Sequence, residues 1–144
     1  MEDMALLKKI NFLKDLNTIE LKQINMIAER SVFRAGEDIV KEGSVCDAFY
    51  IIKNGSVKIV KEGRHIVNLD KEEPIGEVSF IDKGLRSATV TAIDDTVLIK
   101  IPSDSFDKLM AREKELANKI YKAIALILCK RLRETNDVMK LINA

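Results

Sequence analysis

Between residues 31 and 102 the sequence alternates apolar and polar positions with a period of two, and glycine-containing turns interrupt the pattern repeatedly. Asn54-Gly55 is the strongest turn signal, and it predicts a hairpin because both residues accept a positive φ. Turns at intervals of about eight to twelve residues are typical of an antiparallel sandwich or jelly roll rather than of a parallel sheet. The expected strands contain residues 32–33, 39–40, 49–52, 57–60, 66–69, 88–92 and 96–101.

Apolar residues at helical spacing flank the strands on both sides. Residues 5–30 predict a pair of helices, and the capping-box pattern Asn17-Thr-Ile-Glu20 marks the start of the second one. After Pro102, Ser103 or Asp104 can cap a short helix. A long helix is expected to follow from about Lys114 to Ile142.

The sequence therefore predicts a single domain over residues 1–144, of class α+β and mainly β. Its expected architecture is an antiparallel β-roll or jelly roll with N-terminal helices and a long C-terminal helix. The predicted parts are helices at 1–30, the roll at 31–102 and helices at 103–144. A length of 144 residues with 47% hydrophobic residues is enough for a core without disulfides or metals, and it excludes a disordered chain.

The middle of the long helix, residues 123–129, is apolar on every face. A helix that covers one side of a roll needs only one apolar stripe, so apolar residues all round predict burial on two sides. One side is the roll. The other is most simply the same helix of a second subunit, which predicts a parallel two-fold homodimer. The alternative is that another domain or protein covers this second face.

The charge balance excludes several classes of partner. The chain has 24 Lys and Arg residues against 23 Asp and Glu residues, so no overall field favours nucleic acid or an anionic membrane. We find no signal peptide, and the longest apolar run is too short to span a bilayer. Cys46 and Cys129 fit no metal spacing and are expected to be free thiols. The sequence thus predicts a cytoplasmic protein without a membrane contact.

Residues 74–90 carry the candidate binding chemistry. If residues 76–82 form one helical turn after a strand, the amides of Glu77, Val78 and Ser79 point outward as an anion site. Gly76 lets a ligand approach the backbone closely. The carboxylate of Glu77 accepts hydrogen bonds, so its natural partner is a sugar hydroxyl beside a bound phosphate.

Arg86 follows the glycine loop at 83–84 and can fork around phosphate oxygens, with the hydroxyl of Ser87 beside it. The alternative interpretation of Glu77 and Arg86 is an internal ion pair that supports an empty roll. Both readings place the two opposite charges around one small concavity.

Gly76-Glu77-Val78-Ser79 followed by Arg86-Ser87-Ala88-Thr89-Val90 resembles the phosphate-binding cassette of cyclic nucleotide-binding domains. The stretches 33–43 and 47–55 resemble the early strands and turns of this family, so the resemblance covers nearly the whole chain. It implies that Glu77 binds the ribose 2′-hydroxyl and that Arg86 binds the cyclic phosphate, helped by Ser87 and the amides around Val78 and Ser79. Apolar contacts to sugar and base are expected from Ile59 and Ile66, facing inward from the roll.

The layout is most similar to bacterial catabolite-activator regulators, whose long helix forms the dimer seam. Residues 131–136 resemble their segment that reaches the base, which places Thr135 and Asn136 against the base edge. The alternative is two polar residues on a solvated helix turn. Leu85 stands where the family often has proline, and a glycine usual before the cassette is absent from residues 70–74, which leaves the loop shape open. We favour cyclic AMP over cyclic GMP, although the hydroxyl of Ser87 can serve either the phosphate or a guanine amino group.

Other functions fit the sequence less well. His65 is the single histidine, so neither a cupin-type metal centre nor a Ser-His-Asp or Cys-His set is available, and we expect no enzyme and no cofactor besides the ligand. The chain stops at Ala144 without a recognition helix, so direct DNA binding is not expected. The predicted function is a sensor that relays binding through its C-terminal helices. The alternatives are the sensory fragment of a transcription regulator, or a ligand-free dimerisation module.

Overall fold

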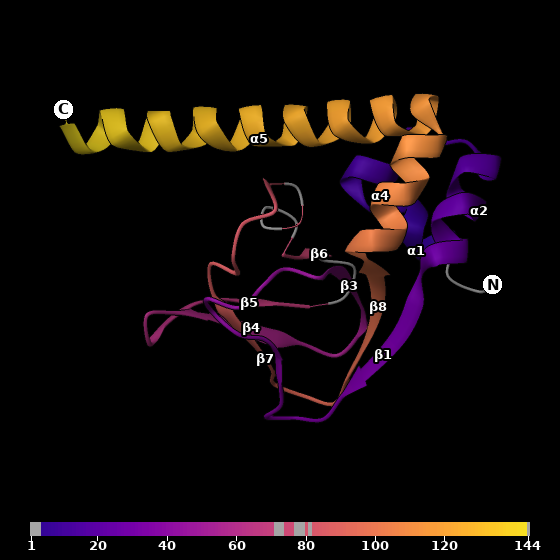
Figure 1. Cartoon of the computed structure of the whole chain (residues 1–144). Helices are drawn as coiled ribbons and strands as arrows, with labels where there is room; N and C mark the ends of the chain where they lie inside the picture. The colour runs from indigo at the N-terminus through magenta and orange to yellow at the C-terminus, as the bar shows by residue number, and fades with distance from the viewer. Residues whose placement is uncertain (1–3, 71–73, 77–79, 81, 144) are drawn as a thin grey trace.

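The strands form two antiparallel sheets that face each other as a roll. The computed structural model describes residues 4–70, 74–76, 80 and 82–143, and within them each sheet has four strands. The first sheet has the order β1-β8-β3-β6 and the second the order β2-β7-β4-β5 (Figure 1). The strand bounds are β1 Glu29–Phe33, β2 Asp38–Val40, β3 Ala48–Asn54, β4 Val57–Lys61, β5 Arg64–Leu69, β6 Pro74–Ile75, β7 Thr89–Ala92 and β8 Thr96–Pro102. The predicted antiparallel roll is confirmed.

The turn at Asn54-Gly55 does not make the hairpin that the sequence predicts. It leads from β3 in one sheet to β4 in the other, and only Gly55 has a positive φ, of 102°. A Cβ at Gly55 would lie 2.6 Å from Thr96 Oγ1, so the glycine lets the chain cross close to the turn before β8. The two-residue hairpin lies one turn later, at Glu62 and Gly63, which have φ of 52° and 76° and join the paired residues Lys61 and Arg64.

Helices precede and follow the roll. The described helices are α1 (Met4–Lys8), the 3-10 helix η1 (Asn11–Leu13), α2 (Thr18–Ile27), α4 (Ser103–Arg112) and α5 (Lys114–Asn143). The predicted capping box at the start of α2 is confirmed, since the side chains of Asn17 and Glu20 each accept the other's amide at 2.9 Å. At α4 the predicted cap is wrong. Strand β8 continues to Pro102 and the helix begins at Ser103, so Pro102 is the N-cap residue, and its side chain has no atom that can accept a hydrogen bond. The Ser103 amide donates to the Asp47 carbonyl at 2.9 Å.

Two buried clusters hold these elements together, and β3 contributes to both. Its successive side chains alternate between the two faces of the sheet. Phe49 and Ile51 pack with the helices, whereas Tyr50 and Ile52 pack between the two sheets. Five consecutive residues from Ala48 to Ile52 are therefore buried, which explains the uninterrupted apolar run in this strand.

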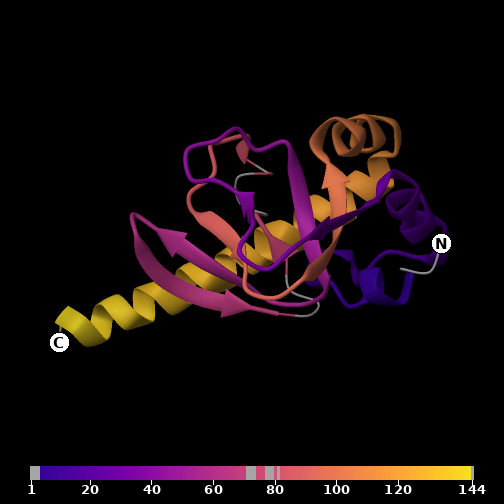
Figure 2. The ribbon, with the colours of Figure 1, turned by 90° about the horizontal axis from the view of Figure 1, so that it is seen from below.

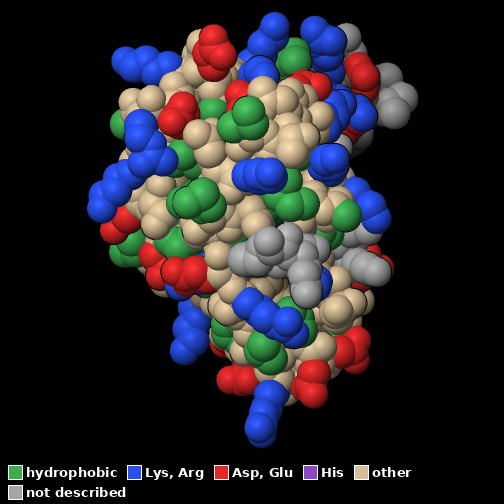
Figure 3. All heavy atoms as spheres, turned by 90° about the vertical axis from the view of Figure 1, so that its right-hand side faces the viewer, with side chains coloured by type: hydrophobic (Ala, Val, Ile, Leu, Met, Phe, Trp, Pro, Cys, Tyr) green, Lys and Arg blue, Asp and Glu red, His purple; other side chains and the backbone are tan. Residues whose placement is uncertain are grey.

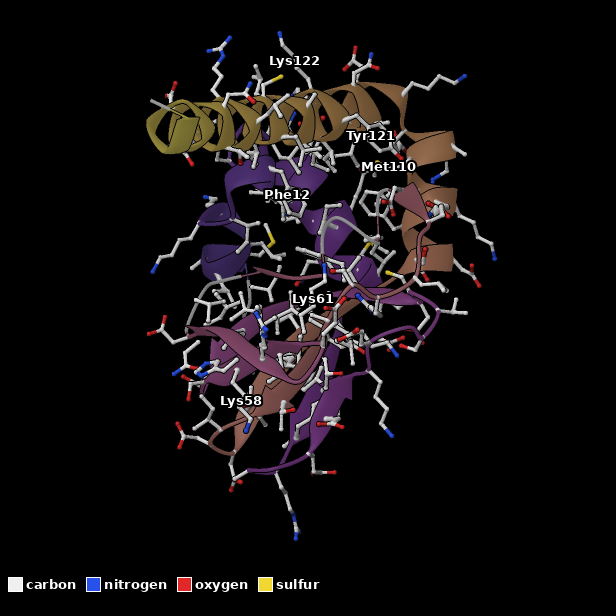
Figure 4. All side chains as sticks on the ribbon, turned by 90° about the vertical axis from the view of Figure 1, so that its left-hand side faces the viewer. Phe12, Lys58, Lys61, Met110, Tyr121 and Lys122 are labelled. Carbon is white, nitrogen blue, oxygen red and sulfur yellow. The ribbon has the colours of Figure 1, made fainter. Side chains whose placement is uncertain are left out.

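Helix α5 lies across the helical side of the roll, and its C-terminal end extends past the β4–β5 hairpin (Figures 1 and 2). Its N-terminal half packs on η1 and buries Leu116, Ile120, Ala123 and Ile124. Phe12 and Met110 lie beneath this part of the helix, whereas Lys122 is on its outer side (Figure 4). No helix in the described part of the chain is long and apolar enough to cross a membrane.

The surface of the helical end carries mixed charge. On the face that shows α2 and α4, basic and acidic side chains are interspersed among small apolar areas (Figure 3). This distribution agrees with the near-zero formal net charge of +1. No large area of one sign is visible on that face that would attract a polyanion.

Candidate functional site

Arg86 is a buried cation at the edge of the roll. The residue is 4% exposed, its Nη2 donates to the Ala48 carbonyl at 2.6 Å, and the Asp47 carboxylate lies 3.8 Å from the same nitrogen. Its backbone pairs with the turn before β3, since the Arg86 amide donates to the Ser44 carbonyl and the Gly43 amide donates to the Arg86 carbonyl, both at 2.8 Å. The guanidinium is thus held in place from both its backbone and its side chain.

The other end of the guanidinium faces Gly76. Arg86 Nη1 is buried and has no hydrogen-bond partner among the described residues. It lies against Gly76, where an added Cβ would collide with Nη1, and Gly76 has a φ of 78°. Only glycine meets both conditions without strain. The structure therefore brings the predicted residues Gly76 and Arg86 together, with one charged nitrogen directed at the backbone of the glycine.

A buried guanidinium nitrogen without a hydrogen-bond acceptor favours an anion as its partner. The Asp47 carboxylate lies 3.8 Å from the other nitrogen, Nη2, so Nη1 still lacks an acceptor among the described residues, and a buried polar atom in that state costs free energy. The planar fork of arginine matches the oxygens of a phosphate. Arg86 is therefore chemically suited to a small phosphate-bearing ligand.

Glu77, Val78 and Ser79, the predicted ribose and phosphate ligands, lie outside the described residues. Beside them, Phe80 is helical and its amide donates to the Gly76 carbonyl at 3.1 Å. Ser87 is described, and it is exposed directly after Arg86.

The sequence predicts that Ile59 and Ile66 face inward from the roll, and the structure agrees for Ile59 but not for Ile66. Ile59 is partly buried and packs against the cluster between the sheets, whereas Ile66 is 59% exposed. The register shifts at this point, so that Val67 pairs with Ile59, His65 pairs with Val60, and Ile66 is the unpaired residue. A one-residue bulge changes which side chains share a face, and Val67 rather than Ile66 stands beside Ile59.

Thr135 and Asn136 are both exposed, in the C-terminal half of α5. Their predicted contact with a base stays a prediction. Sequence reasoning assigned no role to Asp47 and Tyr50, although both belong to a stretch used for the resemblance. The Tyr50 ring centroid lies 6.0 Å from the Arg86 guanidinium carbon. Burial, and next the charge of Asp47, raise the pKa of the Tyr50 hydroxyl, so it stays neutral beside the arginine.

An aromatic column connects this site to the C-terminal helices. Adjacent ring centroids are 5.8 Å apart for Phe49 and Phe80, 4.7 Å for Phe80 and Phe106, and 6.5 Å for Phe106 and Tyr121. Phe12 extends it to η1, at 5.1 Å from Phe49. A small apolar gap runs beside the column, lined by Phe12, Leu13, Ile24, Phe49, Phe80, Ile101, Phe106 and Ile124. The column places Phe80, next to the anion pocket, in contact with α4.

An antiparallel roll with a buried arginine against a glycine, followed by a long helix, defines a regulatory domain for an anionic ligand. The sequence model of the cyclic nucleotide-binding domain matches residues 30–113, more than half of the chain. The protein therefore belongs to the cyclic nucleotide-binding domain family. The predicted resemblance is confirmed.

Known proteins with similar sequences and structures carry the same domain. A cGMP-dependent protein kinase of Toxoplasma gondii is 33% identical over 76% of this chain and 11% of its own length. A cAMP-dependent protein kinase regulatory subunit of Debaryomyces hansenii is 30% identical over 72% of this chain and 23% of its own length. The structure of the Thermus thermophilus catabolite activator protein superimposes with a TM-score of 0.78 and 25% identity, over 92% of this chain and 63% of that one. The chain thus spans less than a quarter of the two kinase-related proteins.

Proposed function

We propose that this chain binds a cyclic mononucleotide between Gly76 and Arg86 and acts as a regulatory sensor without catalytic activity of its own. The observation that carries the proposal is the buried Arg86 Nη1, which has no partner among the described residues and faces Gly76. The cyclic phosphate supplies an acceptor for this nitrogen. Membership of the cyclic nucleotide-binding domain family supports this class of ligand.

The proposed roles of the other site residues follow from the resemblance and from the register. Arg86 binds the phosphate, together with Ser87 and the amides of Val78 and Ser79, and Glu77 accepts a hydrogen bond from the ribose 2′-hydroxyl. The apolar contacts come from Ile59 and, because of the register shift, from Val67 in place of Ile66.

We favour cyclic AMP over cyclic GMP as the ligand. Thr135 and Asn136 offer a hydroxyl and an amide on α5, which suit the hydrogen-bonding edge of adenine. The two kinase-related proteins are named for different nucleotides, one for cGMP and one for cAMP, so both ligands belong in the test.

The exposed face of α5 supports a parallel homodimer. Tyr121, Ala125, Leu128 and Leu132 follow one another at intervals of four, three and four residues, which is the spacing of a coiled-coil seam. All four are exposed although α5 already buries another face against the domain. A second copy of α5 would cover this seam.

In the proposed relay, nucleotide binding at Arg86 changes the position of the cassette, and α4 and α5 follow. The contact of Phe80 with Phe106, and of Phe106 with Tyr121, supports this route because it connects the cassette to the seam of α5. The nucleotide shifts the population only if it binds one helix arrangement more tightly than the other. Such a module serves in the cytoplasm, within a longer regulator or by docking on a partner.

The experiment is a titration of the purified chain with cAMP and cGMP by calorimetry, combined with thermal unfolding. At a nucleotide concentration of a hundred times its Kd, binding stabilises the fold by about 2.7 kcal/mol. For a domain of this size the melting temperature then rises by roughly 5 to 10 °C. If neither nucleotide gives a heat of binding or a shift in melting temperature, the result favours a ligand-free dimerisation module instead.

A further inference from the structure

Lys83 connects the loop before Arg86 to α4. Its Nζ lies 2.9 and 2.8 Å from the two carboxylate oxygens of Asp107 and 3.2 Å from the Ser103 hydroxyl. The same ammonium is 5.4 Å from the centre of the Phe80 ring, in range of a cation–π interaction. One cation thus touches two residues of α4 and one residue of the cassette.

The backbone at Lys83 is unusual for its residue type. Its φ is 59°, in the left-handed region that glycine and asparagine occupy more readily. Beside it, the Asp82 carboxylate accepts the Gly84 amide at 2.7 Å, which closes the turn. A lysine at such a position persists when its surroundings hold it there, and here the side-chain contacts to α4 supply that hold.

The first residue of α4 also touches the wall of the arginine pocket. The Ser103 amide donates to the Asp47 carbonyl at 2.9 Å, and the Asp47 carboxylate lies 3.8 Å from Arg86 Nη2. Ser103 therefore contacts the pocket through its backbone and the cassette loop through its hydroxyl. The loop, the arginine and the start of α4 form one connected set of contacts.

We propose that Lys83 is a positioning residue for nucleotide binding, and that its ion pair with Asp107 couples the shape of the cassette loop to α4. The inference rests on the proposed function and adds a means of regulation to it. A loop held in place before binding loses less conformational freedom when the ligand arrives, so the ion pair raises affinity. By linkage, bound nucleotide strengthens the hold of the loop on α4 by the same factor.

The size of the effect follows from the exposure of the pair. The side chains of Lys83 and Asp107 are 52% and 46% exposed, so solvent and salt screen their attraction. We expect Lys83→Gln and Asp107→Asn each to weaken nucleotide affinity by about two- to fivefold at low salt. The double variant should be no weaker than either single variant, because both remove the same interaction.

The test measures the Kd of the full chain for cAMP and cGMP by calorimetry at low and high salt. Lys83→Arg keeps the charge and should keep the affinity, and high salt should reduce the difference between Lys83→Gln and the wild type. Lys108→Gln is the matched control, since it removes one exposed positive charge from the same helix next to Asp107. Its affinity should equal that of the wild type.

Two outcomes overturn the inference alone. In the first outcome, the wild-type chain binds nucleotide and the Lys83→Gln variant binds it with equal affinity, even if the variant melts at a lower temperature. A merely structural lysine would change stability but not Kd. The other is a double variant whose loss is the sum of the two single losses. If the wild-type chain binds neither nucleotide, the proposed function fails, and the inference fails with it.

Discussion

The guanidinium of Arg86 lies directly against the backbone of Gly76, with no room between them for a Cβ. The arginine is anchored at Nη2 by the Ala48 carbonyl, while Nη1 faces the glycine. A cation placed this way can accept a phosphate without first breaking its own anchor. In the proposed complex the pair of residues forms the anion site, and the glycine matters there for the position of Nη1 as much as for backbone conformation.

Substitution of Gly76 separates these two roles of the glycine. Gly76→Ala introduces strain at a φ of 78° and also displaces Arg86 Nη1. Gly63→Ala is the matched control, because Gly63 has a φ of 76° and no atom within 4 Å of an added Cβ. We expect both variants to lose about 1 kcal/mol of unfolding free energy in urea from the backbone alone. Gly76→Ala alone should lose more unfolding free energy than this backbone contribution. It alone should also bind nucleotide at least about tenfold more weakly than the wild type. Equal affinities for the two variants would contradict the proposed role of this contact.

Removal of the charge at Arg86 should separate binding from folding. In Arg86→Met the phosphate loses its charged partner, which costs about 2 to 5 kcal/mol of binding, or at least about thirtyfold in Kd. The nucleotide-free fold should change by less than about 1 kcal/mol, because relief from burying Nη1 offsets the lost bond to Ala48. Calorimetry and urea unfolding measure the two quantities. Arg64→Met, at the exposed hairpin, should leave both unchanged, and full affinity in Arg86→Met would place the nucleotide elsewhere.

Periodicity and local motifs were enough to predict the roll, the capping box at Asn17 and the long C-terminal helix. These features depend on residues close together in the sequence. The hairpin at Asn54-Gly55 was predicted wrongly, because a turn signal shows that the chain reverses but not which sheet it enters next. The inward position of Ile66 failed for a related reason, since a bulge of one residue shifts the alternation by one.

The contacts that join segments distant in the sequence could not be predicted from it. Lys83 and Asp107 are both ordinary exposed charges in the pattern, and nothing local shows that they meet. The same holds for Glu20. The capping box predicts its contact with Asn17, but nothing local predicts its ion pair with Lys119 of α5. Long-range pairs of this kind depend on how the helices pack, so they emerge only from the folded structure.

Because Glu20 forms an ion pair, we expect the stability of the fold to decrease in acid. Its Oε1 accepts the Asn17 amide at 2.9 Å and the Lys119 ammonium at 2.7 Å. Burial alone would raise the pKa of Glu20, but these hydrogen bonds and the charge of Lys119 outweigh it and lower the pKa below its ordinary 4.5. A carboxylate with a lowered pKa in the folded state stabilises the fold above pH 4.5, and this contribution is lost as the pH falls through the folded-state value.

Urea unfolding between pH 7 and pH 3 tests this prediction. In Lys119→Met the unfolding free energy should be about 1 to 2 kcal/mol lower at pH 7, and its fall between pH 4.5 and pH 3 should be smaller than in the wild type. Lys122→Met removes an equal charge from the outer side of α5 and should keep the wild-type profile (Figure 4). Parallel profiles for the wild type and Lys119→Met would contradict a coupled Glu20.

The seam of α5 gives the sharpest test of the proposed dimer, because two leucines of nearly equal exposure lie on different faces of the helix. Leu132 is 61% exposed and belongs to the seam with Leu128, whereas Leu126 is 62% exposed and lies outside the seam spacing. A lysine at Leu132 would put two like charges together at the centre of a parallel coiled coil, so Leu132→Lys should sediment as a monomer at micromolar concentration. Leu126→Lys adds the same charge outside the seam and should remain a dimer. A monomeric wild-type chain, or loss of the dimer in both variants alike, would show that another partner covers this face.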